Sequence, residues 1–339
     1  MSSLRCAAFA CSALLGAACA AEPPPPEPAV QVRSADVVYH GMRVIPGDGS
    51  PPVEDAVMIV DGGRIAAVGT ADEVAAPAGA TTVDLSGKTL IPALINLHGH
   101  VGFQRGLTYD AANYTRENII DELRRYLYHG VGTVVSLGTD AGGLWQEIQR
   151  DQQVGSLDGA RLYTADRGMA APNAGPGSPA LRPSAAGVTS EEEGRRLVGE
   201  LAAQRASFVK IWVDDRGGTV EKLAPAFYRA IIDEAHRRGL QVIAHVFYHD
   251  DAEDLVAAGV DGFAHLVRDR EMDDALVAAI AAQDVFVMPN LGVSERRRHT
   301  EPPAWLREPL LASTVAPAVL ERAAASYAGF AADAPARAA

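Results

Sequence analysis

The chain has 339 residues, of which 48% are hydrophobic and 22% are charged, a composition typical of a globular protein with a large core. Its 43 acidic residues outnumber its 30 basic ones, and the formal net charge of −13 argues against nucleic acid or an anionic membrane surface as a partner. We therefore expect a small-molecule or dipeptide substrate.

The first 20 residues have the pattern of a secretory signal peptide, with Arg5, an apolar stretch over residues 6–18 and small residues around Ala18. The stretch is too short to span a membrane. All three cysteines lie in this segment, so the exported protein would have no disulfide framework. Residues 14–19, LLGAAC, also resemble a bacterial lipoprotein signal in which Cys19 carries the lipid, although Gly16 stands where a bulky aliphatic residue is usual. We expect an exported protein, either periplasmic or lipid-anchored to a bacterial membrane.

Residues 21–33, AEPPPPEPAVQVR, are proline-rich and predict an extended linker that cannot pair as a central strand. From residue 34 to residue 90, short alternating or β-branched runs separated by turns predict a small β-sandwich-like domain, with a hairpin turn at DGG, residues 61–63. No chemistry is expected in either segment.

Strand and helix patterns alternate from residue 91 to residue 300, which is typical of βα units around a parallel sheet. Strands are predicted over residues 94–101, 131–137, 161–165, 207–213, 241–246, 262–267 and 285–289, and helices over residues 115–128, 144–153, 190–205, 225–238, 251–258 and 272–283. This order predicts an α/β fold, a (β/α)₈ TIM-type barrel that lacks its eighth strand. Residues 168–187, rich in Gly, Pro and Ala, predict a long loop that favours a substrate lid over a solvent flap. Residues 301–339 predict a helical and alanine-rich tail.

Five polar side chains interrupt strands that should be almost wholly apolar, because parallel barrel strands are buried on both faces. His98 and His100 end the first strand, LINLHGHV, two residues apart and therefore on one face. Lys210 lies in SFVKIWV, His245 in QVIAHVF and His265 in GFAHLV. These are the ends of strands one, four, five and six, on the face where such barrels place their sites. Taken singly, each histidine could be a hydrogen-bonded core residue and the lysine could reach the barrel rim.

Over residues 35–300 the chain resembles the amidohydrolase superfamily, specifically its imidazolonepropionase-like and dipeptidase-like members, through the HxH pair followed in order by Lys210, His245 and His265. The resemblance implies a metal-dependent hydrolase barrel with two divalent ions, one bound by His98 and His100 and the other by His245 and His265. A Lys210 carboxylated by CO₂ would bridge them, which burial of a neutral amine favours. Imidazole and carboxylate ligands suit zinc. The implied reaction is hydrolysis of an amide or related C–N bond by a metal-activated water.

One element of the family pattern is missing from the sequence. A complete member ends its eighth strand with an aspartate that binds the first metal and takes the proton of the attacking water, and no strand pattern follows Leu291. Asp140, in VSLGTDAG, follows the second strand and is a weak substitute. Without strand eight, strands one and seven would be open edges. The simplest account is that the chain is a truncated member of the family. The alternative function is then that of an inactive remnant that only binds metal or ligand. Closure of the barrel by a second copy, as a homo-oligomer, is the less favoured account.

Four residues beyond the barrel strands are expected at the mouth of the pocket. Tyr248 and His249 closely follow His245 and could either hold a substrate carbonyl or carboxylate, the catalytic role assigned to Tyr248, or be rim residues without a role. Arg268 and Arg270 follow His265 and could pair with a substrate carboxylate or face water.

Overall fold

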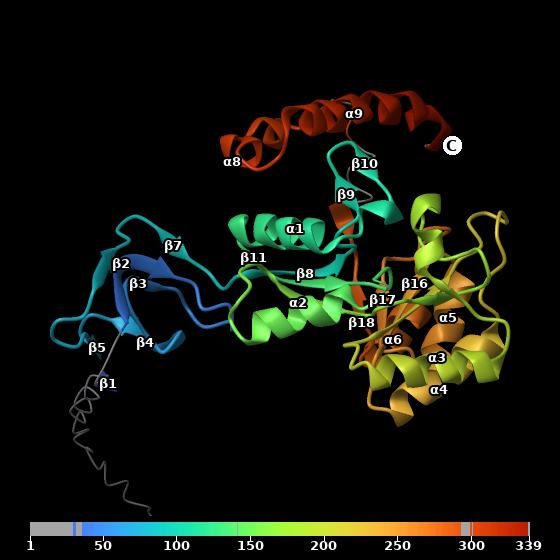
Figure 1. Cartoon of the computed structure of the whole chain (residues 1–339), viewed down its shortest axis with the longest axis horizontal. Helices are drawn as coiled ribbons and strands as arrows, with labels where there is room; N and C mark the ends of the chain where they lie inside the picture. The colour runs from blue at the N-terminus through green and yellow to red at the C-terminus, as the bar shows by residue number, and fades with distance from the viewer. Residues whose placement is uncertain (1–29, 32–35, 141, 293–298, 300, 338–339) are drawn as a thin grey trace, which may run out of the picture. The chain divides into compact units, whose positions relative to one another are not determined.

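The computed structural model describes residues 30–31, 36–140, 142–292, 299 and 301–337 (Figure 1). The chain divides into two compact units, Met1–Pro92 and Ala93–Ala339. The expected signal segment and most of the expected linker lie outside the described residues. Among the residues that the structure describes, no helix has the length and apolar character needed to cross a membrane.

The first unit is built on an antiparallel meander. Strands β2 (Val37–Val44), β3 (Val53–Asp61) and β4 (Arg64–Thr70) pair in sequence, and β6 (Thr82–Asp84) and β7 (Thr89–Leu90) run parallel to β2. Gly62 and Gly63, both with positive φ, form the predicted hairpin turn between β3 and β4. The side chains of Met42, Ala56 and Met58 lie in the apolar core of this sheet.

Near its C-terminal end the predicted linker contains a short strand. Strand β1 (Val30–Gln31) pairs in parallel with β5 (Val74–Ala75) to make a separate two-stranded sheet. The residues of β1 follow the prolines and carry the backbone N–H groups that prolines lack, so they can form a short edge pairing.

The second unit holds parallel strands in the order that the sequence predicts. In the part of the chain that the structure describes they are β8 (Leu94–Gly99), β11 (Val131–Ser136), β12 (Arg161–Thr164), β15 (Val209–Val213), β16 (Val242–Val246), β17 (Gly262–Ala264) and β18 (Phe286–Met288). They form two sheets, β12-β11-β8 and β14-β13-β15-β16-β17-β18, and the Ser207 amide joins the sheets by donating to the Thr164 carbonyl at 2.8 Å. The predicted α/β fold with a parallel sheet is therefore confirmed.

Helices alternate with these strands: α1 (Arg116–Tyr128), α2 (Leu144–Gln153), α3 (Glu191–Ala203), α4 (Pro225–Arg237), α5 (His249–Ala257) and α6 (Asp274–Ala282). Side-chain caps fix where three of them begin, because Thr115, Ser190 and Asp273 each accept a hydrogen bond from an amide in the first turn of α1, α3 and α6. The largest apolar core lies between helices α3 to α6 and strands β15 to β17.

The last helices follow the barrel. They are a 3₁₀ turn at Ala304–Arg307, α8 (Pro309–Ala312) and α9 (Pro317–Arg337). Figure 1 shows α9 beside the hairpin of β9 (Gln104–Arg105) and β10 (Thr108–Tyr109), where Arg322 donates to the Leu107 carbonyl at 2.8 Å. The end of the chain is thus helical, as its composition suggests.

The loop predicted over residues 168–187 contains more structure than expected. It includes strands β13 (Met169–Ala170) and β14 (Ala186–Gly187) and a 3₁₀ turn at Pro179–Ser184. Met169 pairs with Ile211 of β15, so the sheet itself holds the start of this segment in place.

Strands β8 and β18 each have one edge that no other described strand pairs. On β8 the side chains of Leu94, Ile95 and Leu97 are 54%, 60% and 49% exposed, whereas every residue of β15 is buried. Because a closed parallel barrel buries both faces of its strands, this exposure marks an opening in the described barrel wall between β18 and β8.

Candidate metal centre

Four histidines from three strands lie together at the carboxyl ends of the barrel strands. His98 lies in β8 and His245 in β16, while His100 and His265 come one residue after β8 and β17. Ring centroids are 5.3 Å apart for His98 and His100, 4.7 Å for His98 and His265, and 4.8 Å for His245 and His265. The structure thus brings the four sequence-predicted imidazoles into one cluster.

His265 has an unusual backbone. Its φ of 136° lies in a region that residues with a side chain rarely adopt. Such a conformation is unfavourable by about 1–3 kcal/mol and persists only where the surroundings impose it, most often at functional sites.

Lys210 is fully buried, and its Nζ has no hydrogen-bond partner among the described residues. Its stem passes Gly138 and Gly168, where a Cβ atom would come within 2.7 Å and 3.0 Å of the lysine Cγ. Burial lowers the pKa of Lys210 well below its ordinary value, and the nearby charge of Arg216 lowers it further. The amine is therefore expected to be neutral, which is the form that reacts with CO₂.

The imidazoles are neutral for the same reason. Burial is the main cause, and it lowers the pKa of His98 to about 2, of His100 to about 4 and of His245 to about 3. Burial also lowers the pKa of His265. Neutral imidazole is the form that binds metal ions.

Three of the rings have a hydrogen-bond partner on one ring nitrogen, which leaves the other nitrogen for a ligand. The pairs are His98 Nδ1 with Asn290 Oδ1 at 3.3 Å, His100 Nδ1 with Thr139 Oγ1 at 3.1 Å, and His245 Nε2 with Asp214 Oδ2 at 2.8 Å. Metal-binding histidines usually have such an outer partner, which fixes the ring and its tautomer. Sequence reasoning missed all three partners. Asp214 could have been found, because it directly follows the apolar run VKIWV at the carboxyl end of β15.

These observations fit divalent metal ions. Four neutral imidazoles and a buried amine with no described partner surround one place, and imidazole is a preferred zinc ligand. No three of the four histidines have ligand atoms within 4.8 Å of one another.

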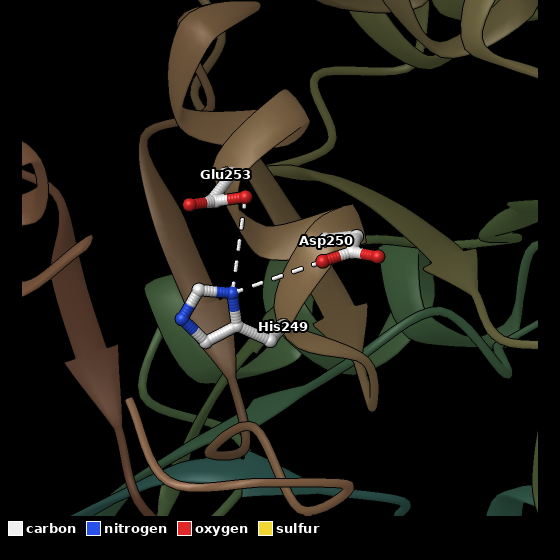
Figure 2. Close-up of side chains that lie close together, drawn as sticks. All are labelled: His249, Asp250 and Glu253. Carbon is white, nitrogen blue, oxygen red and sulfur yellow. Dashed lines mark ion pairs between the residues drawn. The ribbon is translucent and has the colours of Figure 1, made fainter. Parts of the chain in front are cut away.

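A second cluster, drawn in Figure 2, lies at the start of α5. His249 Nδ1 faces Asp250 Oδ1 at 4.0 Å and Glu253 Oε2 at 3.8 Å. Arg270 Nη2 lies 2.9 Å from the same His249 nitrogen and 2.5 Å from Asp250 Oδ1. The guanidinium occupies the position that a metal cation would need, so we do not assign a metal to this cluster. It also pairs two residues that the sequence placed at the pocket mouth, His249 and Arg270, with each other.

The other two residues expected at the mouth have partners as well. The Tyr248 hydroxyl donates to Asp215 Oδ1 at 2.6 Å, and Lys222 Nζ lies 4.4 Å from the centroid of the tyrosine ring. Arg268 donates to the Val246 carbonyl at 3.3 Å. Tyr248 would have to turn its hydroxyl away from Asp215 to hold a substrate carbonyl or carboxylate, and its catalytic role stays a prediction.

Asp140, the weak substitute for the missing aspartate, is buried between β11 and β12. Its carboxyl group accepts hydrogen bonds from Ser136 Oγ at 2.8 Å and from Thr164 Oγ1. Burial raises the pKa of Asp140 to about 7 despite these hydroxyl donors. Its hydrogen bonds hold two barrel strands together and give it a structural part.

Substitution of Asp140 with asparagine is expected to change how stability depends on pH. A carboxyl group with a pKa of about 7 in the folded protein and 3.8 in the unfolded chain keeps its proton only when folded. Between these values the free energy of unfolding therefore falls as pH rises, by about 1.4 kcal/mol per pH unit at most. Urea unfolding of both proteins measures this. The free energy of unfolding of the variant should rise relative to that of the parent up to about pH 7, and the difference should then stay constant. A difference independent of pH, like that expected for the exposed Asp158→Asn, would contradict this.

Solved structures of other proteins have a fold similar to that of this chain. A solved amidohydrolase matches with a TM-score of 0.62 and 21% identity, covering 88% of this chain and 76% of that one. A Xaa-Pro dipeptidase with methionine bound in its active site matches with a TM-score of 0.64 and 18% identity, covering 88% and 75%. The chain has the amidohydrolase superfamily fold. The resemblance predicted from the HxH, Lys, His, His order is thus confirmed at the level of the fold.

The relatives found by sequence match a smaller share of the chain than the solved structures do. No protein-family model matches it. An uncharacterized protein of Mycobacterium tuberculosis is 29% identical over 194 residues, 56% of this chain and 47% of that protein. An enamidase of Eubacterium barkeri is 30% identical over 108 residues, 31% of this chain and 26% of the enzyme. The chain spans about half the length of the first curated relatives it matches.

Proposed function

We propose that the chain is a metal-dependent hydrolase that cleaves an amide or related C–N bond in a small molecule or dipeptide. One observation carries the proposal: four imidazoles gather at the carboxyl ends of barrel strands, together with a buried lysine amine that has no hydrogen-bond partner among the described residues. The amidohydrolase fold supports it, and so do the enamidase and the Xaa-Pro dipeptidase among the similar proteins.

In this proposal His98 and His100 hold one divalent ion, and His245 and His265 hold the other. Zinc is the first choice, since imidazole and carboxylate ligands suit it. The bound ions would supply a water that loses its proton near neutral pH and a Lewis acid for the scissile carbonyl.

Lys210 would bridge the ions after reaction with CO₂. Its neutral amine nitrogen forms a bond to the carbon of CO₂ and releases one proton to solvent, which gives a carbamate. Burial favours the neutral amine, and the product replaces an expensive buried cation with an anion that two cations stabilise. Gly138 and Gly168 leave the space for the lysine stem.

Tyr248 would orient the substrate at the rim of the site. Its hydroxyl donates to Asp215 and would turn to donate to a substrate carbonyl or carboxylate instead. The proposal includes export of the protein, either to the periplasm or to a membrane through a lipid on Cys19. The pattern of residues 1–20 supports this part.

The test is metal analysis joined to an amide hydrolysis assay on the full chain. We expect close to two divalent ions per chain, and turnover of amides or dipeptides in preference to matched esters. A chelator should abolish the turnover, and zinc with bicarbonate should restore it. Bound metal without turnover of any amide would favour an inactive remnant that only binds metal or ligand. A chain that binds no metal at neutral pH in the presence of CO₂ would refute the proposal.

A further inference from the structure

The carboxylate of Asp214 is held in one position by several bonds. Its side chain is 3% exposed. Oδ1 accepts from the backbone amide of Arg216 at 2.8 Å, and Oδ2 accepts from Arg216 Nη1 at 2.7 Å. The other end of the same guanidinium donates to the Gly175 carbonyl at 2.5 Å. A buried carboxylate fixed in this way offers a rigid acceptor to whatever lies beside it.

The group beside it is the ring of His245. Its Nε2 lies 2.8 Å from Asp214 Oδ2. A neutral imidazole has one N–H and one lone pair, and only the N–H can donate to an ionised carboxylate. Arg216 Nη1 also lies near this nitrogen, but at 3.4 Å, so the shorter contact with Asp214 decides the tautomer. It places the proton on Nε2 and leaves the lone pair on Nδ1.

The partners of the other rings are different in kind. Asn290 and Thr139 contact Nδ1 of His98 and His100 at 3.3 Å and 3.1 Å, and both partners are uncharged. Of these three pairs, only that of His245 is short and has an ionised acceptor. A carboxylate partner also makes the opposite ring nitrogen a stronger donor to a metal ion.

We propose that Asp214 is a positioning residue that fixes the tautomer and direction of His245 for metal binding, and that Arg216 holds Asp214 in place. The inference rests on the proposed function, since it names how one of the proposed ligands is prepared. Asp214 itself touches no substrate in this scheme and acts through the imidazole.

The test compares Asp214→Asn with Asp233→Asn in the full chain. Asp233 is an exposed aspartate that also pairs with an arginine, Arg195, but meets no histidine, so it is a matched control. Zinc affinity is measured by competition with a chromophoric chelator. We expect Asp214→Asn to lower the affinity for one of the two zinc ions by about 10- to 100-fold. The control should leave the affinity for both ions unchanged.

A second readout needs no metal. Nitrogen-15 NMR of labelled histidine in the metal-free protein reports which ring nitrogen carries the proton. In the parent protein we expect one imidazole fixed in the Nε2–H form, and in Asp214→Asn we expect that ring to become a mixture of tautomers, because the asparagine side chain can accept or donate. Arg216→Met, which leaves Asp214 without its second bond, should show the same change in weaker form and covers the case in which Asp214→Asn fails to fold.

The outcomes separate the two proposals. Parent protein that binds zinc, with Asp214→Asn binding it equally well and keeping the tautomer, would overturn the role of Asp214 and leave the hydrolase proposal standing. Parent protein that binds no zinc would remove the hydrolase proposal and this inference with it.

Discussion

Replacing Lys210 with methionine is expected to abolish hydrolysis and weaken both metal ions while the barrel stays folded. The lysine amine is buried without a described hydrogen-bond partner, so an apolar side chain of similar length fits the same space. Without the amine no carbamate can form, and the two ions lose the anion they would share. We expect metal affinity to fall by about 100-fold or more and kcat/KM by about 10³.

Metal content, kcat/KM and thermal unfolding in chelator check this prediction together. The melting temperature of the metal-free variant should equal or exceed that of the metal-free parent, because an unpartnered buried polar group has been removed. Lys88→Met, at an exposed lysine in the first unit, controls for the loss of a lysine as such. If Lys210→Met kept two ions and normal turnover, the bridging role of Lys210 would be wrong.

Gly138→Ala is expected to cause a large loss of stability, because two separate costs act at this position. The residue has a φ of +89°, and a Cβ there would lie 2.7 Å from Lys210 Cγ and 2.7 Å from Trp212 Cη2. The first feature strains the backbone and the second overpacks the wall that holds Lys210. Together they should lower the free energy of unfolding by about 3 kcal/mol or more.

Gly142→Ala is the matched control for this substitution. Gly142 has a similar φ of +83°, but nothing lies within 4 Å of its added Cβ. Gly142→Ala should lower the free energy of unfolding only through backbone strain, by about 1 kcal/mol. Urea unfolding of both variants measures the difference, and equal losses would mean that the contact with Lys210 and Trp212 relaxes at no cost.

The barrel elements could be predicted from the sequence because the buried faces of helices and strands require a regular spacing of apolar residues. Helix α2 spans Leu144–Gln153, the range that its periodicity predicts, and α1 begins directly after the cap at Thr115. Strands β13 and β14 were missed because each has two residues, which is too short for a period, and pairing with the rest of the sheet holds them. The β1 pairing was missed for the same reason.

The candidate site was predictable in part. The four histidines and Lys210 stood out because they interrupt apolar strands, and the structure places the four rings in one cluster. Their role as metal ligands stays a prediction. Thr139 and Asn290 could not be found, since their part depends on a hydrogen bond across the fold and neither breaks a local pattern. The strained φ of His265 has no sequence signal at all.

The exposed leucines and isoleucine of β8 have a practical consequence for handling the protein. Leu94, Ile95 and Leu97 lie along an edge whose backbone groups no described strand pairs, and this combination is a template for aggregation. The net charge of −13 repels neighbouring copies, but at 0.1 M salt that repulsion is screened beyond about 10 Å. Colloidal stability should therefore decline as salt is added, and dilute buffer of low ionic strength should preserve single chains longest.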